Sequence, residues 1–297
     1  MKMTLPEVSG DIAFVTGAAS GKRFATGFGL ALSKELVSRG ASVIMTDINE
    51  DGCKKAAAEI NEKAGKNAVI AVKADTTCFE DQVAAYELGK ETFGRVDYFF
   101  ANAGIGEHHW IPLFDPTTSS SRPITKPNMT TLDVTLNGQL NTASLAFQVF
   151  ERQEPNTRTG FRGKLVITSS IIGIWPCKGL PMYSTAKAGV VSFMRTMAGY
   201  YGDKAITVNL IAPNITATSV VPPRFLALFD DDYVCPLELV IEQMISVLGS
   251  CKDNGRAICI SGKETWDHTQ HDAMFEKNRV QFEKMEYEFG KWMGLWE

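Results

Sequence analysis

Ser170, Tyr183 and Lys187 have the residue types and the spacing for acid–base chemistry on a hydroxyl group. Lys187 follows Tyr183 by four residues, which places both side chains on one face of a helix, and Ser170 lies thirteen residues before Tyr183, at the end of a strand-like run. Three further tyrosines have a lysine four residues later, but none of them has a serine thirteen residues earlier. The spacing to lysine alone is weak, and the sequence context selects Tyr183.

Oxidation of an alcohol needs a base for the hydroxyl proton, a donor for the developing alkoxide and a hydride acceptor above the carbinol carbon. A tyrosine phenol has a pKa near about 10, so Tyr183 needs a nearby cation to act as the base, and Lys187 supplies one. Ser170 would hydrogen-bond the substrate oxygen where charge forms. In the reverse reduction Tyr183 is the acid. The alternative, in which Ser170 caps a turn and Tyr183 packs a helix, explains each residue alone but not their joint pattern.

The remaining sequence alternates apolar, β-branched runs with helix-like segments. Strands of a parallel sheet read as continuous apolar runs because helices cover both faces. The pattern therefore predicts an α/β fold, a single doubly wound Rossmann domain over residues 1–262 with a parallel sheet of about seven strands and helices on both faces. The expected strands are residues 11–17, 41–47, 68–75, 96–104, 164–170, 206–214 and 257–262.

Three segments lie outside this alternation. Residues 105–128 and 215–240 are insertions that follow carboxyl ends of strands, where ligands bind in open α/β sheets, so we expect them to form the substrate walls. The tail, residues 263–297, has apolar side chains at helical spacing and predicts an amphipathic helix that packs on the body or on a second subunit. Apolar side chains in or near the walls indicate a hydrophobic small-molecule alcohol or ketone as substrate; they are Trp110, Trp175, Met182, Phe225 and Phe229.

A glycine-rich turn, TGAAS at 16–20, follows the first expected strand and leads to a helix near Phe28. Such a turn lets backbone N–H groups approach a pyrophosphate at the positive end of a helix. Asp47 ends the second strand, where its carboxylate would bind the adenosine ribose and repel a 2′-phosphate, which favours NAD over NADP. Each such residue also suits a plain turn or cap, but their regular placement at successive strand ends favours a cofactor site. The expected cofactor residues are Gly17, Ser20, Phe28, Gly29, Asp47, Asp75, Thr76, Asn102, Ala103 and Gly104.

These motifs together resemble the short-chain dehydrogenase/reductase family over about residues 8–262. The resemblance is carried by TGAAS with the following GFG, Asp47, FFANAG at 99–104, Ser170, YSTAK at 183–187 and IAPNITAT at 211–218. Late segments, VCPLELVIEQMI and NGRAICISG, are most similar to the 15-hydroxyprostaglandin dehydrogenase-like members and fungal alcohol dehydrogenases.

The resemblance implies further contacts and an assembly. Tyr183 and Lys187 would also bind the cofactor, Lys187 at the nicotinamide ribose, while Pro213 and Thr218 would border the carboxamide. A homodimer or homotetramer would form through the helices expected near 129–152 and 182–201. The resemblance also suggests an enzyme of secondary metabolism.

The chain departs from the family pattern at three places. Extra residues lie between Gly21 and Gly29, and Lys22 and Arg23 among them could reach a pyrophosphate or an NADP 2′-phosphate, or the longer turn could prevent cofactor binding.

The second departure falls on Thr135, where the family has a helix asparagine that holds a water of the proton relay. Thr135 would take this catalytic role, or Asn137 would if the helix is reshaped. Third, Asn214 follows Pro213 where the family has glycine, a mild change because asparagine tolerates a left-handed backbone.

Three hypotheses follow. The first is an NAD-dependent oxidoreductase that interconverts a secondary alcohol and a ketone, with Tyr183 as acid and base. Lys22 and Arg23 argue for the second, an NADPH-dependent ketoreductase. The longer glycine turn and Thr135 argue for the third, a nucleotide-binding protein without redox turnover.

Composition excludes several other classes. The formal net charge is −4 without a basic run, so we expect no nucleic-acid partner. No apolar run approaches the roughly 20 residues that span a bilayer, and the start of the chain lacks a secretory segment. Six cysteines form no CxxC pair, which predicts reduced thiols in a cytoplasmic protein and no metal site.

Overall fold

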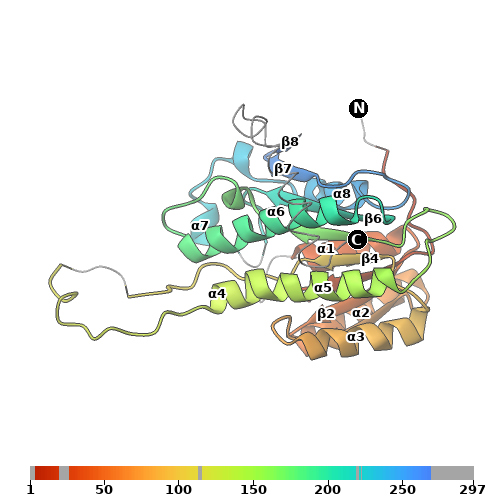
Figure 1. Ribbon diagram of the computed structural model, residues 1–297, viewed down its shortest axis with the longest axis horizontal. Helices are drawn as coiled ribbons and strands as arrows, with labels where there is room; N and C mark the ends of the chain where they lie inside the picture. The colour runs from red at the N-terminus through yellow and green to blue at the C-terminus, as the bar shows by residue number, and fades with distance from the viewer. Residues whose placement is uncertain (1–3, 20–26, 113–115, 219–220, 222, 269–297) are drawn as a thin grey trace, which may run out of the picture. The chain divides into compact units, whose positions relative to one another are not determined.

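Strands and helices alternate along the chain in the computed structural model, as the sequence pattern predicts (Figure 1). The structure describes residues 4–19, 27–112, 116–218, 221 and 223–268. In this part of the chain one sheet has the strand order β3-β2-β1-β4-β5-β6-β7-β8. The strands are β1 (Ile12–Thr16), β2 (Ser42–Asp47), β3 (Val69–Lys73), β4 (Tyr98–Ala101), β5 (Gly163–Thr168), β6 (Ile206–Pro213), β7 (Ala257–Ser261) and β8 (Glu264–Asp267).

β1 to β7 are parallel, and β1 pairs with both β2 and β4. The strand order reverses at this point, because β2 and β3 extend the sheet to one side of β1 while β4 to β7 extend it to the other. Connections that leave β1 and β4 at their carboxyl ends therefore turn to opposite faces. Ligands of open α/β sheets bind in the crevice at such a point.

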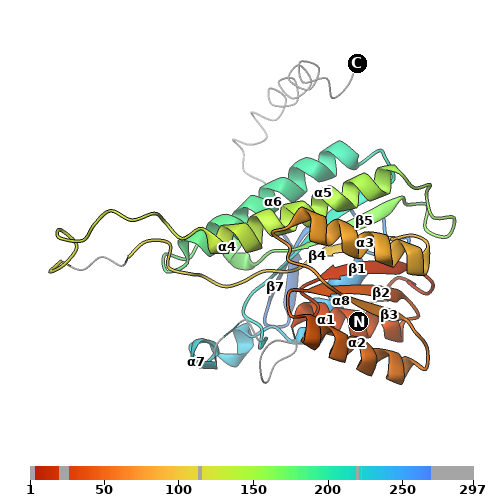
Figure 2. The ribbon, with the colours of Figure 1, turned by 90° about the horizontal axis from the view of Figure 1, so that it is seen from below.

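Helices cover both faces of the sheet (Figures 1 and 2). α1 (Phe28–Ser38), α2 (Glu50–Ala64) and α8 (Leu237–Ser246) pack on one face, and α3 (Phe79–Phe93), α5 (Gly138–Glu151) and α6 (Pro181–Tyr201) pack on the other. Neighbouring residues of β1 contribute to opposite cores, as the alternation of side chains along a strand requires. The shorter helical pieces are α4 (Thr130–Leu132), the π-helical turn η1 (Asp133–Asn137), η2 (Ile171–Gly173), α7 (Pro223–Leu226) and η3 (Asp231–Tyr233).

The prediction of a doubly wound sheet of about seven parallel strands is confirmed, and an eighth, antiparallel strand extends it. β8 pairs with β7 through a short turn in which Gly262 has a φ of +54°. Residues 264–267 fall in the tail for which the sequence pattern predicts a helix, so that expectation is wrong for these four residues. The pattern missed the strand because it is short and partly exposed. Residues 269–297 of the predicted helical tail lie outside the described residues.

The insertion at 105–128 runs out from the body of the domain and returns to α4 (Figures 1 and 2). A backbone hydrogen bond of 2.8 Å from Asn128 N to Trp110 O closes its base. The insertion at 215–240 contains α7 and η3. None of the helices in the described ranges is long and apolar enough to cross a membrane.

Candidate active site

The turn after β1 packs against the end of β4 and the start of α1 at two glycines. Gly17 has a φ of +66°, and a Cβ atom on it would lie 2.9 Å from the Cα atom of Ala103. A Cβ atom on Gly29 would overlap the carbonyl oxygen of Gly17. Phe28 is the first residue of α1. The predicted cofactor residues Gly17, Phe28, Gly29 and Ala103 therefore lie together, whereas Ser20 is outside the described residues, as are Lys22 and Arg23.

Asp47 at the end of β2 faces the same turn. Its Oδ2 accepts a hydrogen bond of 2.9 Å from Ala19 N, and its Oδ1 accepts one of 2.9 Å from Asn49 N. These two bonds fix the carboxylate beside the glycine turn. A carboxylate oxygen can accept more than one hydrogen bond, so Asp47 keeps acceptor capacity for ribose hydroxyls.

Asn102 connects three neighbouring strands at the crevice. Its amide nitrogen donates to Thr16 O at 2.9 Å, and its Oδ1 accepts from Thr168 Oγ1 at 3.1 Å. The backbone N–H groups of Asn102 and Ala103 both donate to Thr16 Oγ1. The side chain of Asn102 therefore holds the ends of β1 and β5 together, and the hydroxyl of Thr16 keeps the backbone of Asn102 and Ala103 in place.

Asp75 and Thr76 follow β3 and organise the start of α3. Asp75 Oδ1 accepts hydrogen bonds from Thr77 N at 2.9 Å and Thr77 Oγ1 at 2.8 Å. A Cβ atom on Gly138 would lie 2.7 Å from Thr76 Oγ1, so Thr76 contacts the start of α5. These contacts are those of turn residues at a strand end. Because β3 pairs with β2, Asp75 follows the strand next to the one that Asp47 ends.

Ser170, Tyr183 and Lys187 come together beyond the ends of β5 and β6. Ser170 follows β5 with its Oγ donating to Pro213 O at 3.2 Å. Lys187 Nζ is buried and lies 5.6 Å from the centre of the Tyr183 ring. It donates a hydrogen bond of 2.7 Å to Thr168 O. The predicted trio is thus one cluster, assembled by a strand end and one face of α6.

Burial shifts the pKa values of both Lys187 and Tyr183. Burial lowers the pKa of Lys187 to about 7, because a charged ammonium is disfavoured away from water. Burial also raises the pKa of the Tyr183 phenol, and a hydrogen bond with Ser170 opposes that shift. A protonated Lys187 and an ionised Tyr183 would stabilise each other at this separation. The ionisation of Tyr183, which it needs in order to act as the base, is therefore coupled to the protonation of Lys187, and the two groups titrate as a pair.

Thr135 lies in the π-helical turn η1 and is fully buried. Its Oγ1 accepts from Ile105 N at 3.0 Å and donates to Ile105 O at 3.1 Å. A Cβ atom on Gly104 would lie 3.6 Å from both Thr135 Oγ1 and Lys187 Nζ, so Thr135 lies near Lys187. Asn137 is exposed and donates to Asp133 at 3.3 Å, which points it away from this site.

Of the two predicted carboxamide residues, Pro213 contacts Ser170. Pro213 ends β6 and its carbonyl oxygen accepts the Ser170 hydrogen bond. Thr218 is buried, and its N–H donates to Thr216 O at 2.7 Å. Asn214 has no positive φ, since Ala205 is the one non-glycine residue with positive φ in the described part of the chain.

Sequence reasoning missed Gln139, a buried side chain at the same crevice. Its Nε2 donates to Ala103 O at 3.1 Å and to Thr168 O at 3.1 Å, so it joins the ends of β4 and β5. Thr168 O therefore receives hydrogen bonds from both Gln139 and Lys187. Gln139 Oε1 is buried without a hydrogen-bond partner among the described residues. Gln139 follows Thr135 by four residues and shares its helix face, but that spacing alone did not distinguish it from other polar helix residues.

The aromatic wall residues differ in exposure. Met182 is buried, Phe229 is half-buried, and Trp110 and Trp175 are 38% and 52% exposed. Trp175 packs against Trp266 of β8 with ring centres 6.2 Å apart, a contact that sequence reasoning did not predict. The side chain of Phe225 lies outside the described residues.

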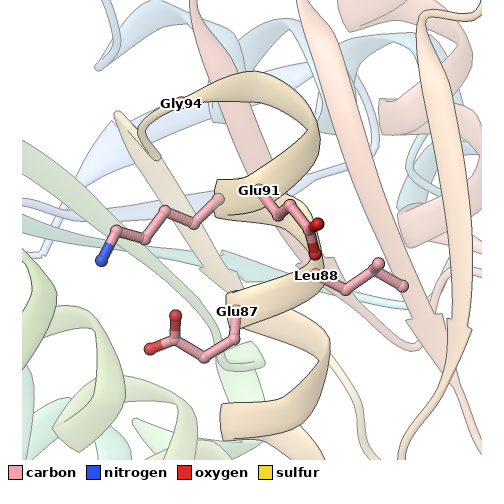
Figure 3. A pocket seen from close by; sticks show the side chains of 5 residues that line it. Glu87, Leu88, Glu91 and Gly94 are labelled. Carbon is pink, nitrogen blue, oxygen red and sulfur yellow. The ribbon is translucent and has the colours of Figure 1, made fainter.

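A surface hollow lies elsewhere, on the outer side of α3 (Figure 3). Its lining residues are exposed, and none is a predicted site residue; they are Glu87, Leu88, Lys90, Glu91 and Gly94. Separately, no group of three or more His, Cys, Asp and Glu side chains in the described ranges is arranged to hold a metal ion.

The residues at the β1–β4 crevice fit a dinucleotide. In the part of the chain that the structure describes, no side chain caps α1 and no acidic residue lies in its first turn, so its N–H groups keep their capacity for an anion. Gly17 and Gly29 leave no Cβ atom between the turn and its neighbours. Asp47 and the Tyr183 cluster lie beyond the ends of strands on opposite sides of this switch point.

The structure is an α/β protein of the doubly wound type, with a tyrosine and a lysine on one helix beyond the strand ends. The family model for short chain dehydrogenases matches residues 11–226. The chain therefore belongs to the short-chain dehydrogenase family, as the sequence motifs predict. Membership of this family supports the prediction of a nicotinamide dinucleotide cofactor, NAD or NADP.

Curated relatives agree with this assignment. The chain is 31% identical over 222 residues to human 3-hydroxyacyl-CoA dehydrogenase type-2, covering 71% of this chain and 75% of that protein. It is 29% identical over 236 residues to short-chain dehydrogenase/reductase prx7 of Penicillium rubens, covering 77% and 79%. It is 28% identical over 218 residues to prx4 of Penicillium roqueforti, covering 73% of this chain but only 58% of that protein.

A solved structure shares the fold. It is the 3-ketoacyl-(acyl-carrier-protein) reductase from Brucella melitensis, crystallised in complex with NADH, with a TM-score of 0.68 and 23% sequence identity. The similarity covers 86% of this chain and 98% of that protein.

Proposed function

We propose that this protein is an NAD-dependent oxidoreductase that interconverts a secondary alcohol and a ketone on a hydrophobic small molecule. The observation that carries the proposal is the cluster of Ser170, Tyr183 and Lys187, with the buried Nζ of Lys187 5.6 Å from the Tyr183 ring. A phenol as acid and base, an ammonium beside it and a serine hydroxyl as donor are the groups that proton transfer at a substrate hydroxyl needs.

The chain's own residues divide the proton chemistry. Tyr183 takes the hydroxyl proton during oxidation and returns it during reduction. Ser170 now donates to Pro213 O and would turn its Oγ–H to the substrate oxygen, where negative charge develops. Burial raises the pKa of Tyr183, and a protonated Lys187 would oppose that shift. The bound nicotinamide supplies the hydride acceptor for oxidation and, when reduced, the donor.

Thr135 supports this chemistry in place of the family asparagine. Its hydroxyl holds both backbone groups of Ile105 beside the catalytic lysine. A π-helical turn often occurs at functional sites because it offers backbone groups that a regular helix would use internally. Thr135 thus fixes the strand-end loop next to the proton path.

Binding of the cofactor uses both halves of the crevice. Gly17, Gly29 and the start of α1 receive the pyrophosphate, Asp47 binds the adenosine ribose, and Lys187 with Tyr183 binds the nicotinamide ribose. Asp75 and Thr76 border the adenine, while Asn102 to Gly104, Pro213 and Thr218 border the nicotinamide. The contacts of Asp47 with Ala19 and Asn49 orient its carboxylate for this role and favour NAD.

The substrate lies between the insertions at 105–128 and 215–240. Exposed Trp110 and Trp175 would cover its apolar part, which supports a hydrophobic alcohol or ketone. We place the enzyme in secondary metabolism by analogy with the family it resembles.

Location and assembly belong to the same proposal. Six cysteines are free, which suits a reducing compartment, the cytoplasm. A homodimer or homotetramer would form through α5 and α6. Light scattering of the purified protein tests this, and a monomer would contradict it.

Fluorescence titration with NADH and with NADPH tests the proposed cofactor. Tight NADH binding that Asp47→Ala weakens at least tenfold, and that the control Glu59→Ala leaves unchanged, would support the NAD enzyme. Glu59 is an exposed acid on α2 and makes a matched control. Preference for NADPH would favour the ketoreductase that uses Lys22 and Arg23.

A deletion of residues 21–26 tests the longer turn. Binding only after that deletion would mean that the natural turn blocks the site. Tight binding without turnover of any compound in a panel of secondary alcohols and ketones would favour a nucleotide-binding protein without redox turnover.

A further inference from the structure

The helix that carries Tyr183 and Lys187 begins without a cap of its own. Leu180 at the N-cap position makes no side-chain hydrogen bond, and Pro181 in the first turn has no N–H group. Met182 and Tyr183 are therefore the first residues whose N–H groups need an acceptor from elsewhere, because the first turn of a helix has no internal acceptors for them.

Glu107 supplies both acceptors from the loop after β4. Its Oε2 accepts from Tyr183 N at 2.7 Å, and its Oε1 accepts from Met182 N at 3.3 Å. A carboxylate is also favoured at the positive end of a helix. One side chain, 76 residues from Tyr183 in the sequence, thus closes the start of α6.

The backbone on either side of Glu107 is itself held by Thr131. This buried threonine donates from its Oγ1 to Gly106 O at 3.2 Å and accepts from His108 N at 3.0 Å. One turn later, Thr135 holds Ile105 in the same way. Two threonines on one helix face thereby fix the loop from which Glu107 reaches α6.

We propose that Glu107 is a positioning residue for Tyr183. By holding the first turn of α6, Glu107 fixes the position of the Tyr183 phenol relative to Ser170. Because Glu107 belongs to segment 105–128, the position of the phenol then depends on the conformation of this substrate-side segment. This inference rests on the proposed function and adds to it a residue outside the predicted trio. Glu107 acts through the backbone of Tyr183 and contacts no reacting atom.

Kinetics separate positioning from a merely structural cap. Glu107→Ala should lower kcat by about 10- to 100-fold, because a displacement of about 1 Å is enough to cost such factors, while KM for the cofactor changes less than about threefold. Glu107→Gln keeps one acceptor oxygen and should recover part of kcat.

Tyr201→Phe is the matched control. Its hydroxyl donates to Glu151 Oε1 at 2.6 Å, so this variant removes a carboxylate contact at the opposite end of the same helix. That end is about 27 Å from Tyr183 at a rise of about 1.5 Å per residue. The control should lose a similar amount of stability and keep kcat.

Amide hydrogen exchange, resolved to single residues, tests the contact without any substrate. Faster exchange at Met182 and Tyr183 in Glu107→Ala, together with a kcat loss that Tyr201→Phe does not share, supports the inference. Unchanged exchange at these two amides, or a kcat within twofold of wild type, overturns it. If the wild type turns over no compound of the panel, the proposed function fails, and the exchange result alone decides whether Glu107 holds the helix.

Discussion

Replacing Lys187 with methionine should make the folded protein more stable at neutral pH. Lys187 Nζ is buried and has a pKa of about 7 in the folded chain, against 10.5 for a free side chain. Between these two values the unfolded chain holds a proton that the folded chain has released. Rising pH therefore favours the folded state, and the cost of the buried lysine is largest below pH 7.

The magnitude follows from the two pKa values. At about 1.4 kcal/mol for each pKa unit, the difference between the two pKa values means that the buried ammonium destabilises the folded state by at most about 5 kcal/mol. From pH 7 to 9.5 the free energy of unfolding of the wild type should rise by at most about 3 kcal/mol relative to that of Lys187→Met. The hydrogen bond to Thr168 O offsets part of the burial cost, so we expect a change of about 1 to 3 kcal/mol over that range.

Urea unfolding of wild type and Lys187→Met, in steps from pH 6 to pH 9.5, measures this difference. Methionine has a similar length and carries no charge, so the variant isolates the titration of the ammonium. Lys54→Met, which removes an exposed lysine on α2, should show no comparable pH dependence. If the difference in the free energy of unfolding between wild type and Lys187→Met stays constant with pH, Lys187 keeps an ordinary pKa in the folded protein and the prediction is wrong.

Three further substitutions test the site and its frame. Gly29→Ala should weaken NADH binding at least tenfold in a fluorescence titration, because its Cβ atom would overlap Gly17 O; wild-type affinity would contradict the tight packing. Thr135→Val should lower kcat by about tenfold while Thr135→Ser keeps it, because the hydroxyl holds the backbone; equal rates would show that the bonds are dispensable. Tyr98→Phe should lower the free energy of unfolding in urea by about 1 to 3 kcal/mol and leave NADH binding unchanged, because the Tyr98 hydroxyl donates to Asp11 and accepts from Gly249 N at the opposite end of the sheet; an unchanged stability would show that these two hydrogen bonds are dispensable.

Periodicity predicted the sheet well because both its faces are buried. The strands β1, β2 and β4 to β7 are buried at almost every position and rich in apolar residues, which a parallel sheet covered by helices requires. β8 gave no such signal, since its side chains are exposed or half-buried. A short edge strand is defined by its pairing with β7, and pairing is not visible in a single segment.

The joint spacing of Ser170, Tyr183 and Lys187 predicted that these residues come together, because two of them share a helix face and the third ends a strand. Glu107 and Gln139 could not be found in this way. Each is a single polar residue whose partners lie on other elements, and those contacts depend on how β4, α5 and α6 meet. Polar residues of this kind become informative only when the acceptors and donors around them are known.

The proposed role of Tyr183 as acid and base is tested by the initial rate of NADH formation from NAD with a panel of hydrophobic secondary alcohols, for wild type and Tyr183→Phe. We expect turnover of at least one alcohol by the wild type and a loss of at least about a thousandfold in Tyr183→Phe, because phenylalanine removes the base. NADH affinity should fall far less than the rate, because Asp47, the glycine turn and Lys187 still bind the cofactor. A Tyr183→Phe variant that keeps the wild-type rate would show that Tyr183 is not the acid and base.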